Sequence, residues 1–231
     1  MSDGRAMTAS YAELDRLMGL MTGDEKHGPS ATSTLDVIWV LYDQILNVTP
    51  QTADDPARDR FVVSKGHGPM AFYAVLAAKG FIDEDQLRGF GSFGSRLGHH
   101  PDRLLIPGVE FSSGSLGHGL PAAVGMAHGL RARRLDARVI CLVGDAEFDE
   151  GSNSEAVVYA GRAGLGNLTV VVIDNRSSTY GWLGGIGRRF AVENWVTHDI
   201  DGRDHHAIAT AFRNTAPDRP TAVVAQVESK G

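Results

Sequence analysis

The sequence predicts an α/β protein built on a three-layer, doubly wound and mainly parallel sheet with helices on both faces. Helical and strand patterns alternate along the chain, which favours parallel strands joined by crossover helices. Two runs, 137–145 (ARVICLVGD) and 168–175 (LTVVVIDN), are apolar almost throughout, as expected of strands covered on both faces. The chain also has 28 glycines, gathered in short loops such as 64–68 and 112–119, which indicates a site assembled from loops.

The first half of the chain predicts three helices and one strand. Segment 32–46 (TSTLDVIWVLYDQIL) carries an apolar stripe at helical spacing, and 60–64 (RFVVS) has the pattern of a short strand. Segment 69–80 is helical and ends at a glycine, a typical C-cap. Segment 120–134 is a helix rich in small residues, so we expect it to pack closely against its neighbours.

The second half continues the alternation. Strand 137–145 is followed by a helix over 154–165 and by strand 168–175, and a helix over 205–215 precedes a last strand over 221–229. At this length one large domain is the natural expectation, so we assign 1–231 to a single domain. We expect it to begin with a helical lead of about 20 residues.

Composition and charge argue against several classes of function. Apolar residues make up 42% of the chain and charged residues 22%, as in ordinary globular domains. The net charge of −6 argues against a nucleic-acid partner, and no apolar stretch approaches the roughly 20 residues that a membrane span needs. The N-terminus lacks the apolar core of a signal peptide, and the single cysteine, Cys141, falls in an apolar run, as a core residue would. Because one cysteine forms no internal disulfide, we expect a cytoplasmic protein.

Acidic and amide side chains follow two of the predicted strands directly. Asp145 ends one strand and opens the acidic stretch DAEFDEG, whereas Asp174 and Asn175 end the other. The 30 residues from Asp145 to Asn175 leave room for one helix, a turn and a return strand, which is one right-handed crossover. Because ligands bind outside the carboxyl ends of the strands in such sheets, we expect Asp145 and Asn175 to meet there.

The residues alone leave two interpretations of this edge open. Carboxylate and amide oxygens are hard ligands that suit Mg²⁺ or Ca²⁺, and a helix beginning near Gly151 would direct backbone N–H groups at an anion. These features indicate a magnesium–diphosphate site. The other interpretation is structural, because acidic residues favour the first turn of a helix and often cap it. On either interpretation Glu147 and Asp149 are expected to be solvated or capping groups.

The acidic stretch and the strand end after it resemble the fingerprint of thiamin-diphosphate enzymes, Gly-Asp-Gly followed by an Asn pair. In this chain 27 residues separate Ala146 from Asp174, which stand where the family has its third Gly and its first Asn. The resemblance implies a set of contacts: Asp145, Asn175 and the backbone carbonyl of Ser177 as metal ligands, and Gly144, Asp145, Ala146, Glu150 and Asn175 beside the cofactor.

Further segments narrow the resemblance to the transketolase family, and they cover nearly the whole chain from about residue 20 on. DRFVVSKGHG resembles the segment whose His touches the cofactor diphosphate, here His67. GHHPD resembles the segment that supplies a substrate-facing His, here His100. SSGSLGHGLPAAVGMA resembles the loop and helix that hold the thiazolium and the diphosphate, which places Ser115, Leu116 and Gly117 on contacting positions.

A third histidine matches the family less closely. His27 corresponds to a substrate-facing His if Asp36 sets the register, although KHGPSA lacks the family's Gly-His-Pro-Gly order. The resemblance implies that His27, His67 and His100 act as acid/base groups. The pair at 205–206 opens a predicted helix, and we expect both of its histidines to be exposed.

The resemblance also implies a reaction. In this family thiamin diphosphate carries the chemistry, and the protein supplies binding, orientation and electrostatics. The implied reaction transfers a two-carbon ketol unit from a ketose donor to an aldehyde acceptor, so the substrates are small sugars or keto compounds. Two alternatives stay open: decarboxylation of a 2-oxo acid with acyl or acyloin transfer, and a non-catalytic metal- or nucleotide-binding regulatory domain.

A partner chain follows from the same resemblance. The family's site also needs a pyrimidine-binding domain, whose glutamate activates the cofactor, and VESKG lies where a full-length transketolase would run on into it. We therefore expect an obligate complex with a separate C-terminal subunit, two copies of each, with Glu150 at the subunit boundary. Apolar residues at the carboxyl edge, such as Leu116, Trp182 and Leu183, would contribute to that interface.

Overall fold

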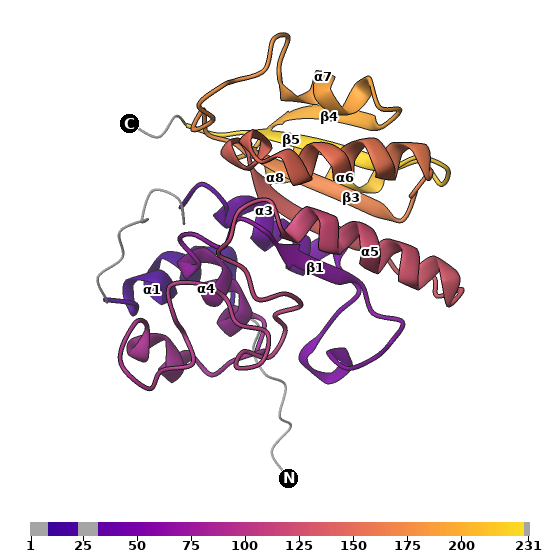
Figure 1. Cartoon of the computed structure of the whole chain (residues 1–231). Helices are drawn as coiled ribbons and strands as arrows, with labels where there is room; N and C mark the ends of the chain where they lie inside the picture. Colours follow the sequence, from indigo (N-terminus) through magenta and orange to yellow (C-terminus); the bar gives the residue numbers. More distant parts are fainter. Residues whose placement is uncertain (1–8, 23–31, 229–231) are drawn as a thin grey trace.

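A single parallel sheet forms the centre of the computed structural model, which describes residues 9–22 and 32–228 (Figure 1). The strands are β1 (Arg60–Val63), β2 (Val139–Gly144), β3 (Leu168–Asp174), β4 (Val196–Asp201) and β5 (Thr221–Gln226). They lie in the order β1-β2-β3-β5-β4, and every neighbouring pair is parallel. The predicted parallel sheet is therefore confirmed.

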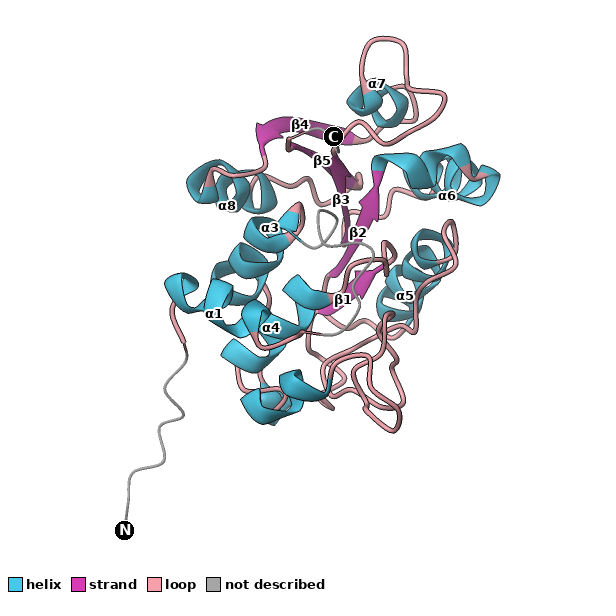
Figure 2. Ribbon diagram, turned by 90° about the vertical axis from the view of Figure 1, so that its left-hand side faces the viewer, coloured by secondary structure: helices cyan, strands magenta, loops and turns pink. Residues whose placement is uncertain are grey.

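Helices cover both faces of this sheet (Figure 2). One face carries α1 (Leu14–Gly19), α3 (Leu35–Val40), α4 (Met70–Ala78) and α8 (His205–Arg213). The other carries α5 (Gly119–Ala132), α6 (Gly151–Arg162) and α7 (Ile186–Ala191). Short 3₁₀ turns lie at Tyr11–Glu13, Pro50–Thr52, Glu84–Gly89 and Asp145–Asp149. The three-layer arrangement is confirmed, and none of the helices in the described ranges is long and apolar enough to cross a membrane.

Alternating side chains along β2 explain why its sequence is apolar throughout. Ile140 and Leu142 belong to the core under α3, α4 and α8, whereas Val139, Cys141 and Val143 belong to the core under α5, α6 and α7. All five side chains are buried. Cys141 is therefore the core residue that the sequence predicted, and burial raises the pKa of its thiol well above the usual range.

Three elements differ from the sequence pattern, and the first is α7, which was not predicted. Strand β4, with the sequence VTHDID, was not predicted; it lies at the edge of the sheet, and its residues are half-buried or exposed. An edge strand tolerates polar residues, so it lacks the continuous apolar run that marks the central strands. The predicted helix 32–46 is also interrupted, because α3 gives way to a π turn over Leu41–Ile45.

A polar network joins α3 to α8. The carboxylate of buried Asp36 accepts hydrogen bonds from the hydroxyl of Tyr11 (2.5 Å) and the guanidinium of Arg203 (2.7 Å), and the Nε2 atom of His205 lies 2.8 Å from it. Arg203 also forms an ion pair with Glu228, just beyond β5. The expectation that both histidines at 205–206 are exposed is therefore wrong for His205, which turns inward to Asp36.

The ends of β2 and β3 are level with each other. Gly144 lies opposite Ile173 in the parallel ladder, so Asp145 leaves the sheet beside Asp174. The connection between the two strands contains α6, which begins at Gly151, where the sequence predicted a helix start. The carboxyl edge of the sheet thus brings residue 145 and the 174–178 segment together.

Candidate functional site

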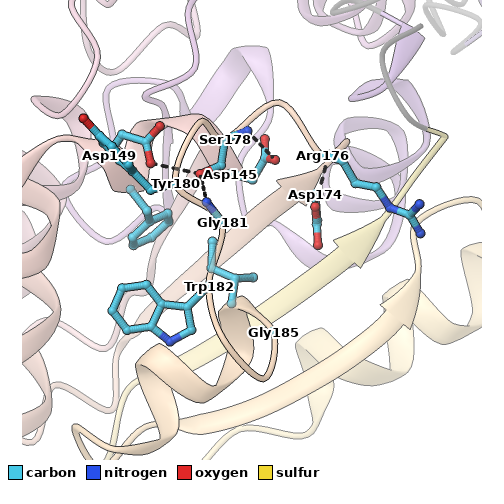
Figure 3. Close-up of a pocket in the computed structure, with 11 residues that line it drawn as sticks. Asp145, Asp149, Asp174, Arg176, Ser178, Tyr180, Gly181, Trp182 and Gly185 are labelled. Atoms are coloured by element: carbon cyan, nitrogen blue, oxygen red, sulfur yellow. Dashed lines mark hydrogen bonds between the residues drawn. The ribbon is translucent and has the colours of Figure 1, made fainter.

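The carboxylate of Asp145 is held by the loop that follows β3. Asp145 is only 3% exposed. Its Oδ2 accepts hydrogen bonds from the backbone N–H groups of Ser177 (2.7 Å) and Ser178 (3.0 Å), and its Oδ1 accepts one from the Ser177 hydroxyl (2.6 Å). Figure 3 shows Asp145 turned toward this loop, where the Ser178 hydroxyl also donates to Asp149. The end of β2 and the loop after β3 are therefore joined through two carboxylates.

Asn175 follows β3 directly and is also 3% exposed. Its Oδ1 atom has no hydrogen-bond partner in the described part of the structure. A buried amide oxygen without a donor destabilises a protein by about 1–3 kcal/mol, so this oxygen is open to a ligand that would satisfy it. Asn167 Oδ1, just before β3, also has no partner among the described residues, so it is the place of Asn175 at the strand end next to that of Asp145 that points to a ligand. Together, Asp145 and Asn175 offer the hard oxygen donors that Mg²⁺ accepts, and backbone, water or phosphate oxygens can complete its shell.

This donor set fits magnesium better than a metal that needs several side-chain ligands. Among the described residues there is no cluster of three or more His, Cys, Asp or Glu side chains able to hold a metal ion. Mg²⁺ is usually bound by only one or two protein side chains together with substrate phosphates, so one carboxylate and one amide are sufficient. Both residues therefore fit the metal that the sequence predicted.

His67 and His100 come together although they belong to different loops. Their rings meet edge to face, with centroids 5.0 Å apart and planes at 84°. His67 is half-buried and His100 is exposed. Gly114, at φ +139°, passes so close that a Cβ there would lie 2.8 Å from Cδ2 of His100. Three glycine-rich loops thus converge at the histidine pair, as the sequence predicted for a site assembled from loops.

The loop over 115–117 packs against the turn before α6. Gly117 is buried at φ +80°, and a Cβ there would lie 2.7 Å from the Cβ of Glu150. The hydroxyl of Ser152 donates to the carbonyl oxygen of Gly117 (2.6 Å). Leu116 is half-buried, whereas Ser115 and Glu150 are exposed. Glu150 therefore packs next to Gly117 and is exposed on the surface of the chain.

Glu147 was expected to be a solvated or capping group. It is 1% exposed, so it is not solvated, but it does cap the turn after β2 by accepting the N–H of Gly144. Its Oε1 accepts from the Ser64 hydroxyl (2.6 Å) and the Gly117 N–H (3.2 Å), and its Oε2 accepts from the Gly144 N–H (3.0 Å). Burial raises the pKa of this carboxyl, and the three hydrogen bonds and nearby Lys65 oppose that rise.

A cavity of about 330 Å³ opens next to Asp145 (Figure 3). Its walls combine acidic, basic and aromatic side chains, among them Asp149, Arg176, Tyr180 and Trp182. Of the predicted site residues within the described ranges, Asp145 alone lines this cavity. The predicted site residues therefore fall into two groups: Asp145 lies at the cavity, whereas the histidine pair and the 115–117 loop lie outside its lining.

The remaining predicted residues are distributed along the same edge. Gly144 is buried at the end of β2, Ala146 is half-buried on the turn that follows, and Ser177 is exposed in the loop after β3. Asp149, predicted to be solvated or capping, accepts hydrogen bonds from the Ser178 hydroxyl and from the N–H of Thr179. The predicted His27 lies outside the described residues.

Comparison with known proteins shows the family of the chain. Residues 19–227 match the family described as transketolase, thiamine diphosphate binding domain. A protein of Rhodococcoides fascians named ferredoxin fas2 is 56% identical over 219 residues, which cover 94% of this chain and 72% of that protein. One of the named subunits of apulose-4-phosphate transketolase, from Actinobacillus succinogenes, is 32% identical over 211 residues, which cover 89% of this chain and 76% of that protein.

Solved structures agree as well. Transketolase from Leishmania mexicana superposes with a TM-score of 0.77 at 25% identity, over 95% of this chain. The chain spans 37% of the length of that transketolase. The chain therefore belongs to the transketolase family, in which it corresponds to the thiamin-diphosphate-binding domain.

Proposed function

We propose that the chain is the cofactor-binding subunit of a two-chain, thiamin-diphosphate-dependent transketolase, which transfers a two-carbon ketol unit from a ketose to an aldehyde. One observation carries the proposal: Asp145 and Asn175 stand at adjacent strand ends, and the buried amide oxygen of Asn175 has no partner among the described residues. A magnesium ion bound to a diphosphate would satisfy that oxygen. Relatives that are named as one subunit of a transketolase, and that this chain matches over most of its length, support the two-chain form.

The metal site in this proposal uses three groups. The side chains of Asp145 and Asn175 and the backbone carbonyl of Ser177 hold Mg²⁺, and Ca²⁺ can substitute for it. The start of α6 would attract the diphosphate, because helix N-termini favour anions. Gly144 and Ala146 are proposed beside it, with the N–H of Gly144 already bonded to Glu147. Asp145 can accept the ion without losing a hydrogen bond, because its Oδ1 accepts only the Ser177 hydroxyl and keeps one lone pair.

The other site residues act on the cofactor and the substrate. When bound, thiamin diphosphate supplies the carbon that attacks the ketose carbonyl and holds the transferred unit. His67, half-buried, donates to the diphosphate, while Ser115, Leu116 and Gly117 hold the cofactor rings in place. His100, exposed beside His67, gives and takes protons at substrate oxygens, and His27 is proposed for the same task.

A second chain completes the site in this proposal. It carries the pyrimidine-binding domain, and we propose two copies of each chain, because closed twofold assemblies are the commonest. Exposed Glu150 and the exposed apolar side chains of Tyr180, Trp182 and Leu183 support an interface at the carboxyl edge. A cytoplasmic location is part of the same proposal and rests on the single cysteine of the sequence.

The substrate is proposed only as a class. One relative is named for apulose 4-phosphate, and another, a Clostridium protein 31% identical over 214 residues, is named for 6-deoxy-6-sulfo-D-fructose. Both names contain a ketose, but the two sugars carry different anionic groups. We therefore propose a ketose donor and an aldehyde acceptor, without choosing one sugar.

The name ferredoxin, carried by the R. fascians relative, suggests electron transfer through an iron–sulfur cluster. Such clusters are held by several Cys thiolates. This sequence has one cysteine, Cys141, and it is buried inside β2. The residues therefore do not fit a cluster, and we do not extend that name to this chain.

The test is reconstitution. The chain is expressed alone and together with a candidate partner bearing the pyrimidine-binding domain, and each sample is supplied with thiamin diphosphate and Mg²⁺. Ketose donors are then compared with pyruvate in the presence of an aldehyde. We expect ketol transfer from a ketose in the mixture only. Activity with pyruvate alone would support the 2-oxo-acid alternative, and full activity of the isolated chain would overturn the two-chain proposal.

A further inference from the structure

Glu147 connects segments that are far apart in the sequence. The Ser64 hydroxyl that donates to it lies 83 residues away, and the Gly117 N–H lies 30 residues away. The same Ser64 oxygen accepts a hydrogen bond from the N–H of Gly119 (3.2 Å), at the start of α5. The backbone carbonyl of Glu147 accepts from the Asn153 side chain (2.9 Å) in α6. One buried residue therefore joins β1, the 112–119 loop, β2 and α6.

Each segment held by Glu147 leads to a residue proposed to contact the cofactor. Ser64 is three positions before His67, Gly117 follows Leu116, and Gly144 precedes Asp145. Glu147 itself lies behind these groups, because its carboxylate is buried and its oxygens are already bonded. It can therefore set their relative positions without touching the ligand.

The chemistry of the contact requires a carboxylate. All three partners of the side chain are donors: a hydroxyl and two backbone N–H groups. An ionised carboxylate only accepts hydrogen bonds, so both of its oxygens suit this environment. A glutamine of the same shape would turn an NH₂ group toward at least one of these donors and leave a buried N–H without an acceptor.

We propose that Glu147 is a positioning residue that holds the His67, Leu116–Gly117 and Asp145 segments in one fixed arrangement before the cofactor binds. The identity of the ligand rests on the proposed function, whereas the bracing itself is a property of this chain. Bracing of this kind favours binding because the loops do not have to be ordered when the ligand arrives.

The first experiment needs no cofactor. Amide hydrogen exchange is measured on the full-length wild-type chain and on Glu147→Gln, without a partner chain. We expect at least one of the Gly117 and Gly144 amides of the variant to exchange about tenfold faster, because glutamine leaves one of these N–H groups without an acceptor, and about 1.4 kcal/mol of lost protection corresponds to that factor. Amides in the centre of β3 should be unchanged. Unchanged exchange at Gly117 and Gly144 would overturn the bracing.

The second experiment measures thiamin-diphosphate affinity by calorimetry in the presence of Mg²⁺. We expect Glu147→Gln to weaken binding about tenfold, the effect of one lost hydrogen bond to a charged group. Glu155→Gln is the matched control, because it makes the same change on an exposed position of α6. Asn167→Ala is the stability control. Asn167 lies just before β3, at the end of the strand opposite to Asp174, and its side-chain amide donates to the backbone carbonyl of Ala127 in α5. Both controls should bind as the wild type does.

The outcomes separate the two proposals. If the wild-type complex does not bind thiamin diphosphate, the proposed function fails, and the exchange experiment still decides the bracing. If the wild type binds and Glu147→Gln binds equally well, the positioning role fails. Should Glu147→Gln not fold, Ser64→Ala replaces it, because it removes the hydroxyl shared by Glu147 and Gly119. Normal cofactor affinity and normal exchange at Gly117 in Ser64→Ala would then overturn the inference.

Discussion

Two side chains at the ends of neighbouring strands, Asp145 and Asn175, differ in their hydrogen bonding. The carboxylate of Asp145 accepts three hydrogen bonds, whereas the amide oxygen of Asn175 has no partner among the described residues. Removing a buried carboxylate that accepts three hydrogen bonds lowers stability more than removing an unpaired oxygen does. The two residues should therefore differ in their effect on stability although both are proposed metal ligands.

The first prediction compares Asp145→Ala with Asn175→Ala. Without metal, we expect Asp145→Ala to lower the free energy of unfolding by about 1–3 kcal/mol, because three donors lose their acceptor. Asn175→Ala should change it by less than about 1 kcal/mol, because the lost oxygen was unsatisfied. Both variants should lose Mg²⁺-dependent cofactor binding. Denaturant unfolding and calorimetric titration measure the two effects, and normal affinity in both variants would refute the metal site.

The second prediction separates the two histidines. We expect His67→Ala to weaken cofactor binding by about 1–3 kcal/mol, the usual loss for a hydrogen bond to a charged group. His100→Ala should lower turnover with little effect on cofactor affinity. Because the two rings are in contact, the effect of the double variant on cofactor affinity and turnover should be smaller than the sum of the effects of the two single variants. Calorimetry and steady-state kinetics on the reconstituted complex provide the measurements. The reverse pattern would show that the loops have been assigned to the wrong sides of the site.

At the level of secondary-structure elements, the Asp36 network joins α3, α8 and the segment after β5. Burial acts to raise the pKa of Asp36, but hydrogen bonds from Tyr11, Arg203 and His205 outweigh it, and the pKa is lowered overall. The ionised carboxylate is therefore more favourable in the folded chain than in the unfolded one.

This shift sets the third prediction, a dependence of stability on pH. Because the folded pKa is depressed, the contribution of Asp36 is fully present above the unfolded Asp pKa of about 4 and is lost as the pH falls through the folded value. Asp36→Asn should lower stability at pH 7 by about 1–3 kcal/mol and flatten the loss of stability below pH 4. Asp218→Asn, on an exposed residue, is the control. Parallel unfolding curves for Asp36→Asn and wild type across this range would contradict the network's role.

At the level of the complete fold, apolar side chains remain exposed around the loop after β3. Tyr180, Trp182 and Leu183 lie in this loop, and Val192 lies just after α7. Tyr180 and Trp182 also line the cavity beside Asp145. Leu183 is 92% exposed, so the fold of the single chain gains little from it. Exposed apolar groups beside a site are typical of an interface.

The fourth prediction is that Leu183→Asp weakens association with the partner chain by at least about tenfold, as for a contact of intermediate strength in an interface. The isolated chain should keep its unfolding free energy, because the side chain is exposed there. Leu104→Asp is the matched control, since Leu104 is 85% exposed and borders a different hollow. Sedimentation velocity of the mixtures measures association. Equal association of both variants and wild type would place the interface elsewhere.

The sheet, its central strands and the meeting of their ends could be predicted from the residues alone. Segments 137–145 and 168–175 are apolar because helices cover both of their faces, and that requirement is visible in the residues themselves. A chain that runs from one parallel strand through a helix to the next must return to the same edge, so Asp145 and the Asn175 segment were bound to meet. These features depend on local patterns and on chain connectivity.

The roles of Glu147, His205 and edge strand β4 became visible only in the folded chain. Glu147 in isolation has the pattern of a capping residue, and its burial depends on Ser64 and Gly117, which arrive from distant segments. His205 turns inward because Asp36, 169 residues away, accepts from it. The strand β4 pairs on one side only, so its residues need no apolar run. In each case the environment of the residues is set by contacts with segments that are distant in the sequence, and a local sequence pattern does not contain those contacts.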